Sequence, residues 1–162
     1  MIHDDLVLTA AHCAAENSIT REVYFQTLRR TEGGIVRRVT DSVAHPDFDA
    51  NVNTREYDFL VLKLDSSALV DPSTGGSTGV ETIQMNTNRA VPATGDRLVV
   101  TGYGAVTDGG SMSNQLRDVQ LEAFAADTCR AHYADLFKED LMFCAGSSPA
   151  GKDACQGRSP TS

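Results

Sequence analysis

Three short segments of this chain carry side chains that could perform acid–base and nucleophilic chemistry. His12 lies near the end of the apolar residues 8–13, Asp58 opens the apolar residues 58–64, and Ser159 follows Gly157 by two positions. An imidazole transfers protons near neutral pH, a carboxylate beside an apolar strand is costly to bury without a partner, and a glycine lets a backbone N–H approach an oxyanion. Taken singly, the segments are equally typical of a structural histidine, a solvated aspartate and a polar turn.

The order of these residues along the chain is informative. The order His, Asp, Ser is that of the chymotrypsin variant of the catalytic triad, whereas subtilisin and the α/β-hydrolases use other orders. The chain resembles the trypsin-like (chymotrypsin-fold) serine proteases across nearly its whole length. The segments that carry this resemblance are residues 8–13 (Leu-Thr-Ala-Ala-His-Cys), 45–48 (His-Pro-Asp-Phe), 58–64 (Asp-Phe-Leu-Val-Leu-Lys-Leu), 100–104 (Val-Thr-Gly-Tyr-Gly) and 153–157 (Asp-Ala-Cys-Gln-Gly).

The resemblance implies a role for each candidate residue. His12 would be the general base and then the general acid, and Asp58 would hold its tautomer and stabilise the imidazolium. Ser159 would be the nucleophile, and the N–H groups of Gly157 and Ser159 would form the oxyanion hole. Asp153 falls where the family places the aspartate of its primary specificity pocket, which favours cleavage after Arg or Lys. The implied function is that of an endopeptidase without cofactor or metal, whose partners are polypeptides with Arg or Lys at the cleavage site and protein protease inhibitors.

The chain departs from the family around Ser159. Residues 157–162 read Gly-Arg-Ser-Pro-Thr-Ser, where the family has Gly-Asp-Ser-Gly-Gly-Pro. In the family that aspartate pairs with the new N-terminal amine after zymogen cleavage. Arg158 reverses the charge, and Pro160 restricts Ser159 to extended conformations. We therefore expect the chain as written to be inactive, and the alternative function is that of a non-catalytic protease homologue that binds a partner.

The resemblance also predicts segments at both ends of the domain that the sequence does not contain. These are the first strands of the first barrel, and the final strands and C-terminal helix of the second. We interpret the chain as a truncated or frame-shifted protease. The coding DNA decides between the two functions: an upstream Ile-Val-Gly-Gly-like start, or a Gly-Asp-Ser-Gly-Gly-Pro in another frame after Gly157, favours a protease, whereas a true stop codon favours the non-catalytic homologue.

Short apolar runs separated by turn residues predict an all-β domain. Strands are expected at residues 5–11, 22–29, 35–43, 58–64, 97–102 and 115–124, with a turn at residues 32–34 and a helix over residues 126–137 capped by Asp127. The resemblance implies a trypsin-like double β-barrel in which both barrels are incomplete. We expect one peptidase domain over residues 1–162, with a partial N-terminal barrel to about residue 75, a linker at residues 71–79 and a partial C-terminal barrel from about residue 80.

Four cysteines, at positions 13, 129, 144 and 155, allow two disulfides in three connectivities. Cys129, His132 and Cys144 could instead supply three ligands of a zinc site, although no fourth ligand has suitable spacing. A disulfide between Cys129 and Cys144 is favoured, because it would close a loop of about 15 residues and stabilise the fold by about 3 kcal/mol. This pair matches a disulfide of the family's second barrel, so the resemblance implies an extracellular, secreted protein.

Composition and charge argue against several other functions. The chain has 162 residues, with 14 Lys and Arg against 22 Asp and Glu, and a net charge of −8. A surface this acidic is unsuited to sequence-independent nucleic-acid binding and to docking on anionic lipid. No apolar run is long enough to span a bilayer. Residues 1–5 are acidic where a signal peptide begins with basic residues, so no export signal is expected in this sequence.

Two ligand-binding motifs are matched only in part. Positions 1, 3, 5, 7 and 12 of an EF-hand loop are occupied by Asp47, Asp49, Asn51, Asn53 and Asp58. Position 6 is not a glycine and a β-strand is expected to follow, so the pattern leaves at most a weak surface calcium site, which calorimetric titration would detect. Residues 102–104, Gly-Tyr-Gly, lack the third glycine and the βαβ unit of a dinucleotide-binding loop.

Overall fold

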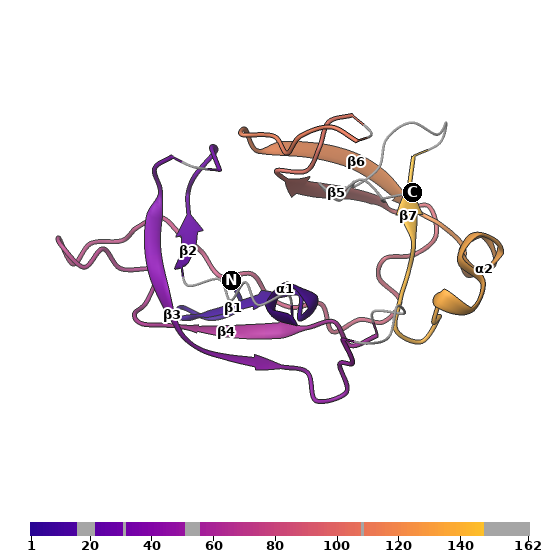
Figure 1. Cartoon of the computed structure of the whole chain (residues 1–162), viewed down its shortest axis with the longest axis horizontal. Coiled ribbons are helices and arrows are strands. Elements are labelled where there is room, and N and C mark those ends of the chain that lie inside the picture. The colour runs from indigo at the N-terminus through magenta and orange to yellow at the C-terminus, as the bar shows by residue number, and fades with distance from the viewer. Residues whose placement is uncertain (16–21, 31, 51–55, 108, 148–162) are drawn as a thin grey trace. The chain divides into compact units, whose positions relative to one another are not determined.

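The computed structural model describes residues 1–15, 22–30, 32–50, 56–107 and 109–147. The chain divides into two compact units, which we call unit 1 (Met1–Thr27 with Gly33–Thr87) and unit 2 (Leu28–Glu32 with Asn88–Ser162). Unit 1 contains a four-stranded sheet and unit 2 a three-stranded sheet (Figure 1).

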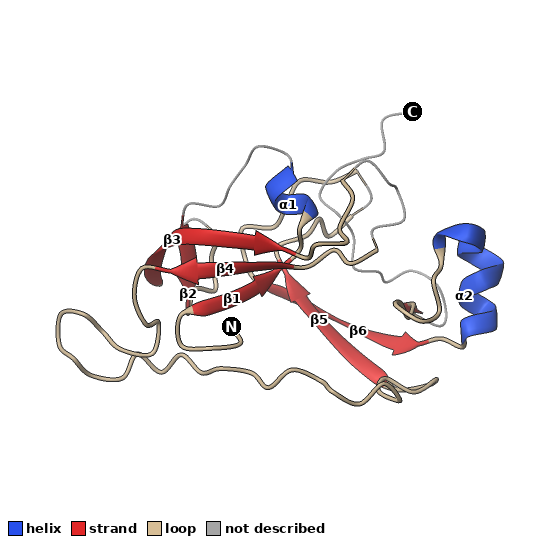
Figure 2. Ribbon diagram, turned by 90° about the horizontal axis from the view of Figure 1, so that it is seen from below, coloured by secondary structure: helices blue, strands red, loops and turns tan. Residues whose placement is uncertain are grey.

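The sheet of unit 1 has the strand order β1–β4–β3–β2, and neighbouring strands are antiparallel. The strands are β1 (Leu6–Thr9), β2 (Glu22–Phe25), β3 (Ile35–Ala44) and β4 (Leu60–Leu64). The long β3 pairs with β2 through its first half and with β4 through its second half, and its register shifts between Val39 and Asp41. Figure 2 shows β1, β4 and β3 side by side. Strand β3 therefore connects β2 to the pair formed by β4 and β1.

Alternating side chains of β4 build the core of unit 1. Leu60, Leu62 and Leu64 are buried and the intervening Lys63 is exposed, which is the period of two expected of a half-buried strand. Leu60 and Leu62 pack with the buried Ala11, which follows β1. The core therefore lies at the ends of β1 and β4, next to the positions of His12 and Asp58.

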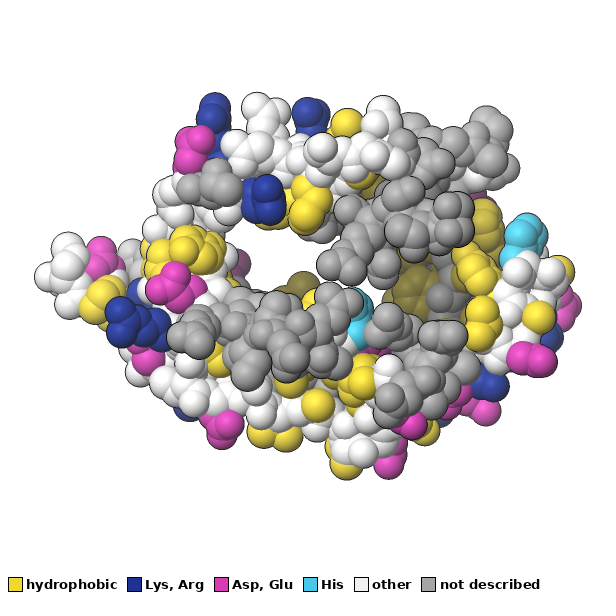
Figure 3. All heavy atoms as spheres, in the orientation of Figure 1, with side chains coloured by type: hydrophobic (Ala, Val, Ile, Leu, Met, Phe, Trp, Pro, Cys, Tyr) yellow, Lys and Arg dark blue, Asp and Glu magenta, His cyan; other side chains and the backbone are white. Residues whose placement is uncertain are grey.

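Unit 2 is built on one long hairpin. Strand β5 (Arg97–Gly102) pairs antiparallel with β6 (Arg117–Ala123) along its whole length, and the short β7 (Ala145–Gly146) extends the sheet beyond β6. Helix α2 (Ala126–Tyr133) follows β6 and continues into a 3₁₀ turn, η1 (Ala134–Leu136). In Figure 3, which has the orientation of Figure 1, hydrophobic side chains reach the surface where Figure 1 places α2, and Tyr133 and Leu136 are among the exposed residues.

The predicted helix forms, but its predicted cap is wrong. The residue at the N-cap is Ala125, which makes no side-chain capping bond, and the α-helix ends at Tyr133 rather than Phe137. Asp127 lies in the first turn, where its Oδ1 accepts a hydrogen bond from Nη2 of Arg130 at 2.6 Å. A carboxylate in the first turn also interacts favourably with the helix dipole. The aspartate therefore supports the helix from inside its first turn.

The predicted strands form with shorter ends in most cases. The bounds of β5 coincide with the expected residues 97–102, whereas the runs at residues 5–11 and 22–29 extend beyond β1 and β2. The turn before β3 forms as predicted. Gly34 has a φ of +87°, and a Cβ at this position would lie 2.5 Å from the carbonyl oxygen of Phe25, so only glycine fits.

The segment interpreted as a linker, residues 71–79, lies within unit 1 and contains a hydrogen-bonded turn. The N–H of Gly75 donates to the oxygen of Asp71 at 2.7 Å, and the N–H of Asp71 donates to the oxygen of Gly76 at 2.9 Å. Across the described residues, no helix is both long and apolar enough to cross a membrane.

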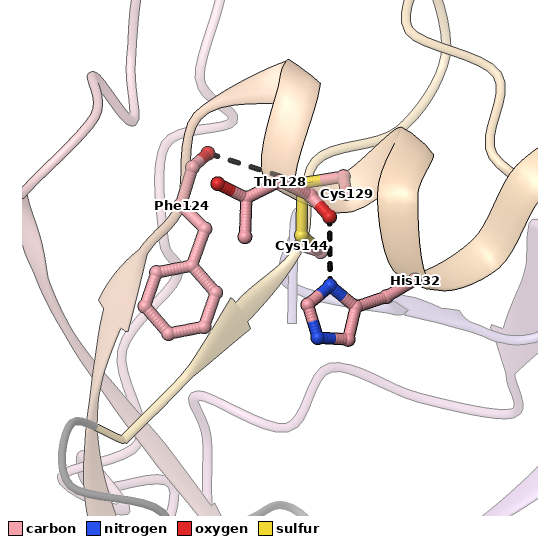
Figure 4. The surroundings of a disulfide bond; sticks show 5 residues. All are labelled: Phe124, Thr128, Cys129, His132 and Cys144. Carbon is pink, nitrogen blue, oxygen red and sulfur yellow. Dashed lines mark hydrogen bonds between the residues drawn. A yellow bond between two sulfur atoms is a disulfide. The ribbon is translucent and has the colours of Figure 1, made fainter.

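A disulfide joins Cys129 of α2 to Cys144, next to β7 (Figure 4). Cys129 is 1% exposed, and its bond to Cys144 closes a loop with a sequence separation of 15. The ring of His132 bonds through Nδ1 to the carbonyl oxygen of Thr128 at 2.9 Å. Because the disulfide consumes both sulfurs, neither is a thiolate that could bind zinc, and the alternative of a zinc site at these residues is contradicted.

A buried guanidinium holds the segment after β4 against β3. Arg37 is 6% exposed, and its Nε, Nη1 and Nη2 donate to the carbonyl oxygens of Ser67, Val36 and Val70 at 2.9, 2.9 and 2.7 Å. Burying a charged group is unfavourable unless hydrogen bonds replace its water. These three bonds meet that requirement and fix the chain where it leaves β4.

Replacing Arg37 with Met should destabilise the protein by about 1–3 kcal/mol, because backbone carbonyls lose charge-assisted donors. The free energy of unfolding from urea titration measures the effect. The matched control is Arg38→Met at the neighbouring exposed position, which should change stability by less than about 0.5 kcal/mol. Equal losses in the two variants would contradict the structural role of Arg37.

Replacing both Cys129 and Cys144 with Ala should destabilise the protein by about 3 kcal/mol, because the unfolded chain regains the entropy of the open loop. The midpoint of urea unfolding should fall in the double variant. A reductant should lower the midpoint of the parent protein to about the same value and leave the double variant unchanged. A double variant as stable as the oxidised parent would refute this account.

Candidate active site

The pairing of β1 with β4 brings together two residues that are 46 positions apart, His12 and Asp58. Thr9 lies opposite Leu60 at the end of this antiparallel ladder. His12 begins the short helix α1 (His12–Ala15) just beyond Thr9, and Asp58 comes just before Leu60. The two side chains therefore leave the sheet at the same end.

Both oxygens of the Asp58 carboxylate accept hydrogen bonds from His12. The backbone N–H of His12 donates to Oδ1 at 2.7 Å, and the ring Nδ1 donates to Oδ2 at 2.6 Å. The two side chains are partly buried, with 29% of His12 and 18% of Asp58 exposed. Bonds to an ionised acceptor are short and strong. One carboxylate thus fixes both the backbone and the ring of the histidine.

The environment of Asp58 favours its ionised form. Burial is the largest single influence and by itself would raise the pKa of the carboxyl group. The hydrogen bonds from the ring and backbone of His12, the charge of His12 and the backbone N–H of Ala11 act in the opposite direction and together hold the pKa of Asp58 below its ordinary value of 3.8. The group is therefore a carboxylate at neutral pH.

The hydrogen bond at Nδ1 determines what the other ring nitrogen can do. In a neutral imidazole only one nitrogen carries a proton, so donation from Nδ1 leaves Nε2 as an acceptor. Nε2 lies 3.7 Å from Sγ of the exposed Cys13. A proton taken up at Nε2 produces an imidazolium that the Asp58 carboxylate stabilises. This arrangement is suited to general-base catalysis.

His45 and Tyr57 also belong to the surroundings of Asp58, although sequence reasoning assigned them no role there. Their rings stack with centroids 4.8 Å apart and planes inclined by 13°. The sequence signals are the position of Tyr57 directly before Asp58 and the His-Pro pair at residues 45–46, which belongs to one of the segments that carry the family resemblance.

The other predicted site residues fall outside the described part of the chain. These are Ser159, Gly157 and Asp153. The structure therefore brings together His12 and Asp58 and describes no position for the other three. Of the partial EF-hand pattern, positions 51 and 53 also lie outside the described residues, and Asp58 is already bonded to His12.

Comparison with known sequences gives a consistent result. A family model described as Trypsin matches residues 1–159. The chain is 30% identical to the trypsin Blo t 3 of Blomia tropicalis, over 98% of this chain and 59% of that protein. It is 34% identical to a vitellin-degrading protease of Bombyx mori, over 98% of this chain and 58% of that protein. The chain therefore spans less than two thirds of the length of these relatives.

Comparison with solved structures supports the predicted fold. The chain matches the structure of neuropsin, described as a serine protease expressed in the limbic system of mouse brain, with a TM-score of 0.77 and 27% identity. The match covers 98% of this chain and 67% of that one. The fold expected from the resemblance, a double β-barrel, is confirmed.

Replacing Asp58 with Asn should remove a pH-dependent contribution to stability. Because the pKa of Asp58 is lowered in the folded state, its contribution is fully present above the ordinary value of 3.8 and is lost as the pH falls through the lower folded pKa. The difference in unfolding free energy between the parent and Asp58→Asn should therefore shrink as the solution is acidified from neutral pH. Urea titrations along a pH series measure it.

The matched control for this series is Glu81→Gln, at an exposed carboxylate. As a substitution at an exposed surface position, it should change the free energy of unfolding by less than about 0.5 kcal/mol. A gap between the parent and Asp58→Asn that stays the same at every pH would show that the carboxylate is not stabilised in the folded state.

Proposed function

Because the chain belongs to the trypsin family, we propose that it is a serine endopeptidase whose catalytic triad consists of His12, Asp58 and Ser159. The observation that carries this proposal is the 2.6 Å hydrogen bond between Nδ1 of His12 and Oδ2 of Asp58. A histidine that accepts a proton at Nε2 must carry its own proton on Nδ1, and this hydrogen bond holds it there.

In this proposal each residue acts at a stated atom. Nε2 of His12 removes the proton of the Ser159 hydroxyl while its oxygen attacks the peptide carbonyl, and His12 then donates that proton to the leaving amine. Asp58 stabilises the imidazolium. The N–H groups of Gly157 and Ser159 stabilise the tetrahedral oxyanion, and water releases the acyl group by the reverse sequence.

The substrate class in this proposal is polypeptides cleaved after Arg or Lys. Asp153 would lie at the base of the pocket for the side chain before the scissile bond, where a cationic side chain neutralises it. Protein protease inhibitors, which occupy the same pocket, are a further class of partner. The disulfide between Cys129 and Cys144 supports an oxidising, extracellular location.

Two residues beside Ser159 lead us to expect that the chain as written hydrolyses substrates only slowly. Arg158 places a cation where the family has an aspartate, and Pro160 restricts the backbone of Ser159. These observations favour a second candidate function, that of a non-catalytic protease homologue. Such a homologue would bind a protein partner through the surface that it retains from the protease.

An ester-hydrolysis assay tests the proposal. The purified chain should hydrolyse an arginine ester no faster than its Ser159→Ala variant. The double variant Arg158→Asp with Pro160→Gly should gain hydrolysis that Ser159→Ala and His12→Ala each abolish, because the nucleophile and its proton acceptor act as a unit. Initial rates over a range of ester concentrations give kcat and KM.

The result separates the two candidate functions. Hydrolysis by the unaltered chain that depends on Ser159 would show that Arg158 and Pro160 are compatible with catalysis. Double-variant activity that prefers arginine over leucine esters, with the preference lost in Asp153→Ser, supports the proposed specificity. A double variant without Ser159-dependent hydrolysis would contradict the endopeptidase and favour the binding protein.

A further inference from the structure

Asp58 lies at the centre of a tight turn with an unusual backbone. The preceding residue, Tyr57, has a φ of +54°, a left-handed conformation that bulky side chains rarely adopt. The N–H of Phe59 donates to the carbonyl oxygen of Tyr57 at 2.7 Å. This hydrogen bond closes a three-residue turn that has Asp58 as its central residue. Strain of this kind persists only where the surrounding structure holds it in place. The turn must therefore be held from outside.

His45 contacts the residues on both sides of Asp58. Its ring stacks on the ring of Tyr57, with centroids 4.8 Å apart and an interplanar angle of 13°. Its backbone N–H donates to the carbonyl oxygen of Phe59 at 2.9 Å. Aromatic stacking and a backbone hydrogen bond thus hold the residue before Asp58 and the residue after it.

His45 is itself fixed relative to the core. Its ring Nδ1 accepts a hydrogen bond from the N–H of Asp47 at 3.2 Å, and its carbonyl oxygen accepts one from the N–H of Phe48 at 3.0 Å. Phe48 packs against the core cluster that contains Ala11. A continuous series of contacts therefore links the core, His45, the turn and Asp58.

We propose that His45 and Tyr57 are positioning residues that hold the Asp58 carboxylate in hydrogen-bonding geometry with His12. Neither side chain needs to touch a substrate, because both act through the turn that carries Asp58. The strained φ of Tyr57 is maintained by the stack, and the stack is anchored by the backbone of His45. The catalytic consequence rests on the proposed function, whereas the hydrogen bond between His12 and Asp58 does not.

NMR spectroscopy of the whole chain tests the proposal without requiring activity. The proton on Nδ1 of His12 should give a low-field resonance, assigned by its absence in Asp58→Asn. Tyr57→Phe and His45→Phe retain stacking rings and should keep the resonance. Tyr57→Ala, which removes the ring but keeps the unfavourable φ, and His45→Ala should lose it. In those two variants the pKa of Asp58, followed by carboxyl ¹³C shifts, should rise, because burial is no longer outweighed by the hydrogen bonds from His12.

Phe59→Ala is the matched control, since Phe59 also flanks Asp58 but the residue is 53% exposed. It should keep the resonance. A folded Tyr57→Ala or His45→Ala that keeps the resonance would overturn the proposal, and so would its loss in Phe59→Ala. His45→Ala leaves residue 57 unchanged, so it decides the question if Tyr57→Ala fails to fold.

Kinetics provide a second measurement in the background of Arg158→Asp with Pro160→Gly. Tyr57→Ala should lower kcat by about 10- to 100-fold with little change in KM, because a misplaced carboxylate affects the transition state more than substrate binding. Tyr57→Phe should restore kcat. If no variant hydrolyses the ester, the endopeptidase proposal fails and the NMR result still decides whether His45 and Tyr57 position Asp58.

Discussion

The double hydrogen bond between Asp58 and His12 is the interaction on which the site depends. A partly buried carboxylate is unfavourable unless donors replace its water, and His12 supplies two of them, one from its backbone and one from its ring. Because both come from one residue, the start of α1 and the orientation of the imidazole are fixed together. The same contact that satisfies Asp58 leaves Nε2 of His12 as the proton acceptor, so one geometry meets a requirement of folding and a requirement of the proposed catalysis.

The strand register that builds the core also assembles this pair. Thr9 lies opposite Leu60, and the leucines at positions 60, 62 and 64 are buried on one face of β4. A slip of one residue would turn those side chains to the other face and move Asp58 away from His12. Hydrophobic burial therefore enforces a polar contact that by itself could not fix two residues so distant along the chain. The strand ladder stops at Leu60 and Asp58 lies beyond it. The turn at Tyr57 therefore determines the position of the Asp58 carboxylate.

The sequence predicts what depends on local patterns and misses what depends on distant partners. The alternation of residues 60–64 indicates a half-buried strand, and the motifs around His12 and Asp58 identify a pair that the structure brings together. Asp127 has the residue type of an N-cap, but its carboxylate bonds to Arg130 and the N-cap lies two residues earlier, at Ala125. The burial of Arg37 could not be predicted, because its acceptors at residues 67 and 70 are far along the chain and are backbone carbonyls with no sequence signature. The positive φ of Tyr57 could not be predicted for the same reason, because the ring that stacks on Tyr57 belongs to His45, which is distant in the sequence.

The proton-transfer pair and the nucleophile have separate physical requirements. The two hydrogen bonds that join Asp58 to His12 lie within unit 1, and they provide a donor for each carboxylate oxygen. A trypsin-family chain can therefore keep a well-formed pair whatever residues surround its serine. In the proposed function Arg158 and Pro160 act on a different step, because they place a cation and a restricted backbone next to the residue proposed as nucleophile. The sheet of unit 1 and its hydrogen-bonded pair follow from the strand register, whereas the proposed rate of peptide hydrolysis depends in addition on residues 157–160. The proposed protease and the proposed binding protein therefore share one sheet and one proton-transfer pair, and they differ at the residues around Ser159.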